Sequence, residues 1–261
     1  MCTLVAYVGW SPALPLVVAA NRDEFLDRPA SEPAVIALAP WVLAGQDLSA
    51  GGTWFGLNAH GMVVGLLNRR RPEGPDPTRR SRGLLCLEVL QSASLAAATA
   101  LLNAVPPLDY NPFNLLVADA GGARVVASDG RALRITTLPR GVHLLTNLDL
   151  NDPTCPRIAK SSSRFATLQL PPDGDASALV GPLSAILADH TTALDPRATI
   201  IDTLCVHRQG YGTRSASIVA ISASSAPRYW HAAGPPCRTA FHELALPEKT
   251  AGIVPGQGLS D

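Results

Sequence analysis

Short apolar runs separated by turn residues dominate the sequence, and this pattern predicts antiparallel β-hairpins. The first hairpin joins Thr3–Val8 to Leu16–Ala20 through a turn that contains Gly9 and Pro12. Such a hairpin would hold the start of the chain rigidly within a sheet. The predicted strands are Thr3–Val8, Leu16–Ala20, Thr53–Leu57, Met62–Leu67, Asn114–Ala118, Arg124–Ala127, Arg131–Leu138, Val142–Thr146, Ser215–Ile221 and Arg228–His231.

Segments with helical character fall into two groups between these strands. Ser81 stands at the N-cap position of a helix whose apolar face includes Leu84 and Leu87. The other predicted helices are Leu95–Asn103, Ile158–Leu168 and Ala176–Asp189. Because strands and helices do not alternate regularly, the pattern favours an α+β fold in a single domain over residues 1–261, with a ragged tail from about 247 to 261.

The composition limits the classes of function. Apolar residues make up 47% of the chain, and 21 basic residues balance 21 acidic ones. Zero net charge argues against nucleic acid as the main ligand, and no apolar run is long enough for stable membrane insertion. The 5 cysteines show no Cys-x-x-Cys pair and no zinc-site spacing, so we expect no metal, free thiols and a cytoplasmic location.

Cys2 follows the initiator methionine and carries the most specific chemistry in the chain. Aminopeptidases remove Met1 when the next residue is small, and the mature chain would then begin with a thiol and a free α-amine on one residue. The thiolate is a strong nucleophile, and the amine is a base that ionises near neutral pH. Chance also places a cysteine at a given position, so neighbouring residues must support this interpretation.

Asn21-Arg22-Asp23-Glu24 ends the second predicted strand, beside the start of the first. A guanidinium there would lower the thiol pKa of Cys2 and favour the thiolate. Asp23 or Glu24 would bind and orient the α-ammonium. The alternative is an ordinary charged turn.

Polar residues also stand at other strand termini. Asn68 and Asn147 each follow a predicted strand, where a neutral amide can donate to a developing oxyanion. The alternative for each is an ordinary turn-forming asparagine. Arg214 precedes an apolar strand and would bind a substrate carboxylate or hold an anion of the site; the alternative is an ordinary surface guanidinium. Arg69 belongs to an arginine-rich loop that would attract an anionic substrate or simply flank a solvated turn.

Together, several short motifs resemble the NRDE family, also called the Transport and Golgi organisation type 2 family. The resemblance extends from residue 2 to about residue 242. It rests on Cys2, Asn21-Arg22-Asp23-Glu24, Gly51-Gly52-Thr53-Trp54, Asn68, Tyr211-Gly212-Thr213-Arg214-Ser215 and Gly234-Pro235-Pro236-Cys237.

The resemblance implies an N-terminal-nucleophile (Ntn) hydrolase-like αββα fold: two antiparallel sheets packed face to face, with helices outside. The chain is also similar to cysteine Ntn hydrolases that cleave penicillin V and conjugated bile salts. Their catalytic residue types occur here in the same order, although those enzymes separate the early Arg and Asp by two residues. These positions are Cys2, Arg22, Asp23, Asn68, Asn147 and Arg214.

Arg22 and Asp23 are adjacent in this chain, so they point to opposite faces of a strand, and Glu24 becomes a rival for the acidic role. The resulting hypothesis is a cysteine amidohydrolase that acts on a small acylated amide without a cofactor. Residues expected to bind its substrate are Asn21, Glu24, Trp54 and Arg69.

Two other classes of function stay open. One is a haem or lipid carrier that keeps the fold without turnover, for which Cys155-Pro156 resembles a thiolate–proline haem pair. The other is an interaction scaffold, which would not need polar strand ends gathered in one place. The sequence leaves the oligomeric state open.

Overall fold

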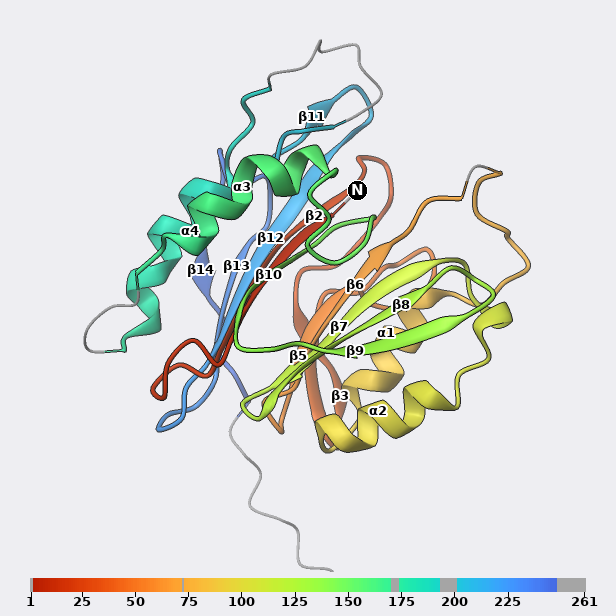
Figure 1. Cartoon of the computed structure of the whole chain (residues 1–261), viewed down its shortest axis with the longest axis horizontal. Helices are drawn as coiled ribbons and strands as arrows, with labels where there is room; N and C mark the ends of the chain where they lie inside the picture. Colours follow the sequence, from red (N-terminus) through yellow and green to blue (C-terminus); the bar gives the residue numbers. More distant parts are fainter. Residues whose placement is uncertain (1, 72, 170–173, 193–200, 248–261) are drawn as a thin grey trace, which may run out of the picture.

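Two antiparallel sheets are stacked face to face, and each carries a pair of helices on its outer face (Figure 1). The computed structural model describes residues 2–71, 73–169, 174–192 and 201–247. This arrangement confirms the predicted α+β class and the αββα layering. The predicted tail lies almost entirely outside the described residues.

The first sheet contains the start of the chain and has the strand order β10-β1-β2-β12-β13-β14, with β11 paired to β12. Hydrophobic alternation correctly predicted its β1–β2 hairpin, in which Thr3 pairs with Asn21 and Val8 with Leu16. Its strands are β1 (Thr3–Val8), β2 (Leu16–Phe25), β10 (Gly141–Leu145), β11 (His207–Arg208), β12 (Tyr211–Ile221), β13 (Arg228–Ala232) and β14 (His242–Glu243).

The second sheet is a meander in which consecutive strands are neighbours. Two of its strands, β3 and β4, have no counterpart among the predicted ones. The strands are β3 (Ala34–Leu38), β4 (Trp41–Ala44), β5 (Phe55–Asn58), β6 (Val63–Asn68), β7 (Phe113–Asp119), β8 (Gly122–Ser128) and β9 (Leu133–Thr137).

The helices lie where the sequence predicts them, with small shifts at their ends. α1 (Arg82–Leu90) and α2 (Leu95–Asn103) cover the second sheet, and α3 (Pro156–Ala166) and α4 (Val180–Leu187) cover the first (Figure 1). Within the described ranges, none of the helices combines the length and apolar character needed to span a bilayer.

Three apolar cores separate the four layers. Leu4, Leu16 and Leu57 belong to the core between the sheets. A second core packs α3 and α4 against the first sheet, and a third packs α1 and α2 against the second. Burying apolar surface on both faces of each sheet stabilises the arrangement and gives the strands their apolar character.

One boundary differs from the prediction in a way that matters for the site. The second predicted strand ends at Ala20, whereas β2 continues through the polar segment to Phe25. The pairing of β12 with β2 explains this extension, because Tyr211 faces Phe25 and Gly212 faces Glu24. The four polar residues therefore alternate between the two faces of a strand and do not form a charged turn.

Candidate active site

Cys2 lies half-buried just before β1, in the wall of a cavity of about 530 Å³. Its Sγ lies 3.8 Å from the backbone carbonyl oxygen of Asp23, to which the thiol donates. We call this space the Cys2 cavity. Its lining includes Cys2, Arg22, Glu24, Trp54, Asn68 and Arg69.

Sheet register places Cys2 between two of the predicted site residues. Thr3 pairs with Asn21 and Leu4 with Leu145, so continuing each ladder sets Cys2 opposite Arg22 on one side and Asn147 on the other. Residues that face each other across antiparallel strands point to the same side of the sheet. The register therefore sets the Arg22 guanidinium beside the Cys2 thiol on the inner face, whereas Asn147 lies two residues beyond the end of β10 and is not among the residues that line the Cys2 cavity.

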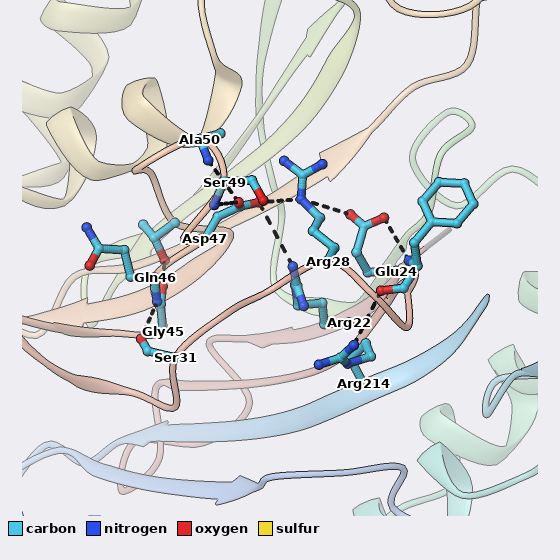
Figure 2. Close-up of polar contacts among 12 residues, drawn as sticks. Arg22, Glu24, Arg28, Ser31, Gly45, Gln46, Asp47, Ser49, Ala50 and Arg214 are labelled. Carbon is cyan, nitrogen blue, oxygen red and sulfur yellow. Dashed lines mark hydrogen bonds and ion pairs between the residues drawn. The ribbon is translucent and has the colours of Figure 1, made fainter. Parts of the chain in front are cut away.

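Arg22 is held by an aromatic ring and a carboxylate. Its guanidinium carbon lies 4.0 Å from the ring centroid of Trp54, and its Nη2 lies 4.0 Å from Oδ2 of Asp47. Figure 2 shows that Asp47 also binds Arg28, whose Nε donates to the same carboxylate at 2.7 Å. Arg22 is only 6% exposed, so these contacts hold its charge near Cys2.

Glycine at position 52 brings Trp54 into place. A Cβ on Gly52 would lie 2.1 Å from the backbone carbon of Gly83, so only glycine lets the loop pack this closely against the start of α1. The Thr53 backbone N–H then donates to the Gly83 carbonyl at 3.0 Å. This close approach sets the loop that presents the indole to Arg22.

Asp23 faces the opposite side of β2. Its Oδ2 accepts from Arg157 Nη1 at 2.9 Å, and its Oδ1 accepts from Thr213 Oγ1 at 2.6 Å. Both charged side chains are 0% exposed. The carboxylate therefore holds α3 and β12 together, while the backbone carbonyl of the same residue contacts Cys2.

The side chains of Asn21 and Glu24 also point to opposite faces of β2. The Asn21 Nδ2 donates at 2.9 Å to the carbonyls of Leu187 and Leu204, which fastens the helix layer to β2. Glu24 lines the Cys2 cavity, on the same face as Arg22, and its Oε2 lies 3.9 Å from Arg28 Nε (Figure 2). The structure thus brings Glu24 to the cavity and directs the Asn21 side chain away from it.

Arg214 lies at a β-bulge in β12. The residues on either side of it pair with β2: Thr213 pairs with Asp23, and Ser215 pairs with Arg22. The Arg214 guanidinium donates to the backbone carbonyls of Phe25 and Leu26. Figure 2 shows Arg214 beside the end of the segment that carries Arg22 and Glu24. Arg214 is not among the residues that line the Cys2 cavity. Its position indicates that it braces the end of β2.

Asn68 and Arg69 reach the cavity from the second sheet, at the end of β6. Arg69 pairs with Asp149 at 2.7 Å and donates to Asn114 Oδ1 at 3.1 Å. The arginine-rich loop lies beside the same cavity and gives it a cationic lining. The arginines in that lining, besides Arg22, are Arg28, Arg69, Arg70, Arg71, Arg79, Arg80 and Arg82.

Two residues central to this geometry, Asp47 and Arg157, were not among the predicted site residues. Asp47 stands in an irregular loop where the sequence pattern gives no signal. Arg157 is buried at the start of α3, next to Pro156, and long charged residues are rarely buried without a partner. Only the fold, which brings residue 157 to residue 23, reveals that partnership.

The electrostatic environment of Cys2 combines opposing effects. Burial raises the pKa of the Cys2 thiol, and the Asp23 carboxylate raises it further, while the Arg22 guanidinium lowers it. We expect Arg22→Gln to raise the pKa of this thiol, because a nearby positive charge that favours the thiolate is removed. The thiolate fraction at neutral pH then falls.

Alkylation of Cys2 by iodoacetamide, followed by peptide mass spectrometry across a pH series, measures this effect. Arg22→Gln should slow alkylation at neutral pH by roughly three- to tenfold and move the profile to higher pH. The matched control is Arg80→Gln, which lines the same cavity but pairs with Glu88, and it should keep the wild-type profile. Equal profiles for all three proteins would contradict a role for Arg22 in tuning the thiol.

Solved structures of known amidases share this fold. Penicillin V acylase from Agrobacterium tumefaciens matches with a TM-score of 0.57 and 14% identity, covering 89% of this chain and 83% of the acylase. The Caenorhabditis elegans ortholog of N-acylethanolamine-hydrolyzing acid amidase matches with a TM-score of 0.52 and 13% identity, covering 84% and 92%. The chain thus has an Ntn-hydrolase-like fold.

Sequence comparison identifies the family. The profile of the family "Transport and Golgi organisation 2" matches residues 1–231. The Transport and Golgi organization protein 2 homolog of Bos taurus is 26% identical over 232 residues, which cover 81% of this chain and 83% of the relative. The chain belongs to the Transport and Golgi organisation 2 family, as its motifs predict.

Proposed function

We propose that this protein hydrolyses the amide bond of a small acylated substrate, with Cys2 as the nucleophile. The position of the Cys2 thiol in the wall of a large cavity, with Arg22 opposite it in the sheet register, is the observation that carries the proposal. The Ntn-hydrolase-like fold supports it, because this fold suits a nucleophile at the start of the first strand.

In the proposed reaction, removal of Met1 first frees the α-amine of Cys2. That amine takes the thiol proton, and the thiolate attacks the amide carbonyl carbon. The C–N bond then breaks, the leaving amine takes the proton from the α-ammonium, and a thioester remains on Cys2. A water molecule, deprotonated by the same amine, attacks the thioester to release the carboxylic acid and restore the thiol.

Two carboxamides are candidates for stabilising the oxyanion. Asn147 follows β10 and lies opposite Cys2 in the extended register, and Asn68 lines the cavity from the other sheet. Asn147 Oδ1 is buried without a hydrogen-bond partner among the described residues. Because Oδ1 is an acceptor, Asn147 would stabilise an oxyanion through its Nδ2, which is the donor of the carboxamide.

We expect Asn147→Ala to lower kcat by about 10²–10³-fold, the usual effect of losing one oxyanion donor. Asn103→Ala, which changes an exposed asparagine at the end of α2, is the matched control and should keep wild-type kinetics. If Asn147→Ala retains the wild-type kcat while binding of substrate is unchanged, the oxyanion assignment is wrong.

The cationic lining of the Cys2 cavity favours a substrate that carries a negative or strongly polar group. Penicillin V and N-acylethanolamines, named for the structural relatives, are reasonable first members of a screening panel. The panel should pair each neutral acyl amide with an anionic analogue of the same acyl length. Hydrolysis of the anionic members at a higher kcat/KM supports the proposal, and a panel without any hydrolysis counts against it.

The alternative proposal is a haem or lipid carrier that uses the same cavity without turnover. The cavity volume of about 530 Å³ and its arginines favour an anionic ligand of this kind. Cys155, the sequence candidate for haem, is buried in the core between the first sheet and α3, with its Sγ 3.5 Å from Thr146 Oγ1. Haem held by Cys155 would therefore require that core to open.

A haem titration separates the carrier from the enzyme. A Soret shift that persists in Cys2→Ala, together with no hydrolysis by the wild type, would favour the carrier. Loss of that shift in a variant of the cavity arginines, such as Arg69→Gln, would locate the ligand in the Cys2 cavity.

A further inference from the structure

Two cysteines and two histidines from separate segments meet at the edge of the first sheet, beside β11. The Cys205 Sγ lies 3.6 Å from the Cys237 Sγ and 3.5 Å from the His207 Nε2. The His207 Nε2 lies 3.1 Å from the Cys237 Sγ. His190 lies next to two of these residues, since its ligand atom and those of His207 and Cys237 all lie within 4.8 Å of one another.

These separations match those between the ligands of a tetrahedral metal ion. Zinc binds thiolate sulfur at about 2.3 Å and imidazole nitrogen at about 2.0–2.1 Å, so neighbouring ligand atoms lie about 3.3–3.8 Å apart. The three contacts among Cys205, His207 and Cys237 fall close to this range. Two thiolates and two imidazoles are also a ligand set that zinc prefers.

The orientation of His190 fits the role of a fourth ligand. Its Nδ1 lies 3.1 Å from the Ala188 carbonyl oxygen, a contact that fixes the ring and leaves Nε2 for a metal. Metal-binding histidines commonly use one nitrogen in this way. His190 and His207 are exposed, so an ion can reach the group from solvent.

A disulfide is the main competing interpretation of the two cysteines. Their sulfur atoms lie 3.6 Å apart, far beyond the bonded distance of about 2.05 Å, and both thiols are free. A disulfide also does not explain why two histidine rings lie beside these cysteines. The geometry is therefore better explained by a shared metal ion.

We infer that Cys205, His207, Cys237 and His190 form a structural zinc site, a role that is independent of the proposed hydrolysis. Such a site would join the segment after α4, the β11 turn and the loop after β13. All four positions are provided by protein side chains, which is typical of structural zinc sites, whereas catalytic ones leave a position for water.

The site would also brace the strand that carries the acidic residues near Cys2. Val206, between two of the ligands, donates its backbone N–H to Thr213 Oγ1 at 2.8 Å, and that hydroxyl donates to Asp23 Oδ1 at 2.6 Å. Two hydrogen bonds, both through the Thr213 hydroxyl, therefore connect the segment that carries the ligands to Asp23. Figure 1 shows β11 at the end of the first sheet where the chain begins.

Metal analysis of the full chain, purified without chelators, tests the inference. We expect about one zinc ion per chain in the wild type and less than a tenth of that in Cys237→Ser and in Cys205→Ser. Cys86→Ala, which changes a buried cysteine of α1, is the matched control and should keep its zinc. His190→Ala should weaken zinc binding by at least about tenfold.

Cobalt substitution provides a readout that does not depend on the folding of a variant. The wild-type chain loaded with Co²⁺ should show thiolate-to-cobalt charge transfer and the intense visible bands of tetrahedral coordination. Absence of these bands at saturating Co²⁺ would overturn the inference. Equal zinc content in wild type and both cysteine variants, or a Cys205–Cys237 disulfide in the non-reduced native protein, would overturn it as well.

Discussion

Cys2→Ala should abolish hydrolysis, with a loss in kcat on the order of 10⁴–10⁶-fold for any substrate that the wild type cleaves. The variant lacks the protein nucleophile that, in the proposed mechanism, attacks the amide carbonyl and carries the acyl group as a thioester. Binding should survive, because the cavity lining beyond the thiol is unchanged. The folded state should also survive, since Cys2 is half-buried and alanine keeps its backbone conformation.

Two comparisons make this result specific. Cys86→Ala should keep wild-type activity, because the Cys86 thiol lies outside the Cys2 cavity. This control is stringent, since the Cys86 sulfur is fully buried and its loss disturbs the core more than the loss of the half-buried Cys2 sulfur. Cys2→Ser should retain at most a trace of activity, because a serine hydroxyl is a weaker nucleophile next to the same amine. Full activity in Cys2→Ala would eliminate the mechanism, whatever the effect of the other variants.

Asp23→Asn should destabilise the fold by about 3–5 kcal/mol, the usual effect of removing one partner from a buried ion pair. It would remove the carboxylate that pairs with the Arg157 guanidinium, which is 0% exposed. The Thr213 hydroxyl would lose its charged acceptor as well. Urea unfolding at neutral pH, followed by circular dichroism, measures the change in the free energy of unfolding.

The exposed ion pair between Arg69 and Asp149 is a matched control. It has nearly the same separation, 2.7 Å, but the Asp149 side chain is 60% exposed, so Asp149→Asn should change stability by less than about 1 kcal/mol. Removing both members of the buried pair, in Asp23→Asn with Arg157→Met, should recover part of the loss. Equal effects of Asp23→Asn and Asp149→Asn would contradict a structural role for the buried pair.

Alternating apolar residues made much of the fold predictable from the sequence. The β1–β2 hairpin and the helix Leu95–Asn103 follow from local patterns that tertiary packing did not override. The same alternation predicted that Arg22 and Asp23 would point to opposite faces, which the structure shows. The extension of β2 to Phe25 was not predictable locally, because it depends on pairing with β12, almost two hundred residues away in sequence.

Contacts between distant segments account for what the sequence did not reveal. Arg157 meets Asp23 only after α3 packs on the first sheet, and Asp47 meets Arg22 through an irregular loop. The spacing of His190, Cys205, His207 and Cys237 matches no zinc motif, yet folding brings their ligand atoms together. The roles of the predicted site residues in catalysis stay predictions until a substrate is identified.

Trapping the acyl-enzyme tests the central claim most directly. Wild-type protein is mixed with a cleavable acyl amide, quenched in acid and digested, and the first peptide is sequenced by mass spectrometry. The account predicts a peptide that begins at Cys2 and carries the acyl group on its sulfur. A peptide that retains Met1, or an acyl group attached to any other residue, would contradict it.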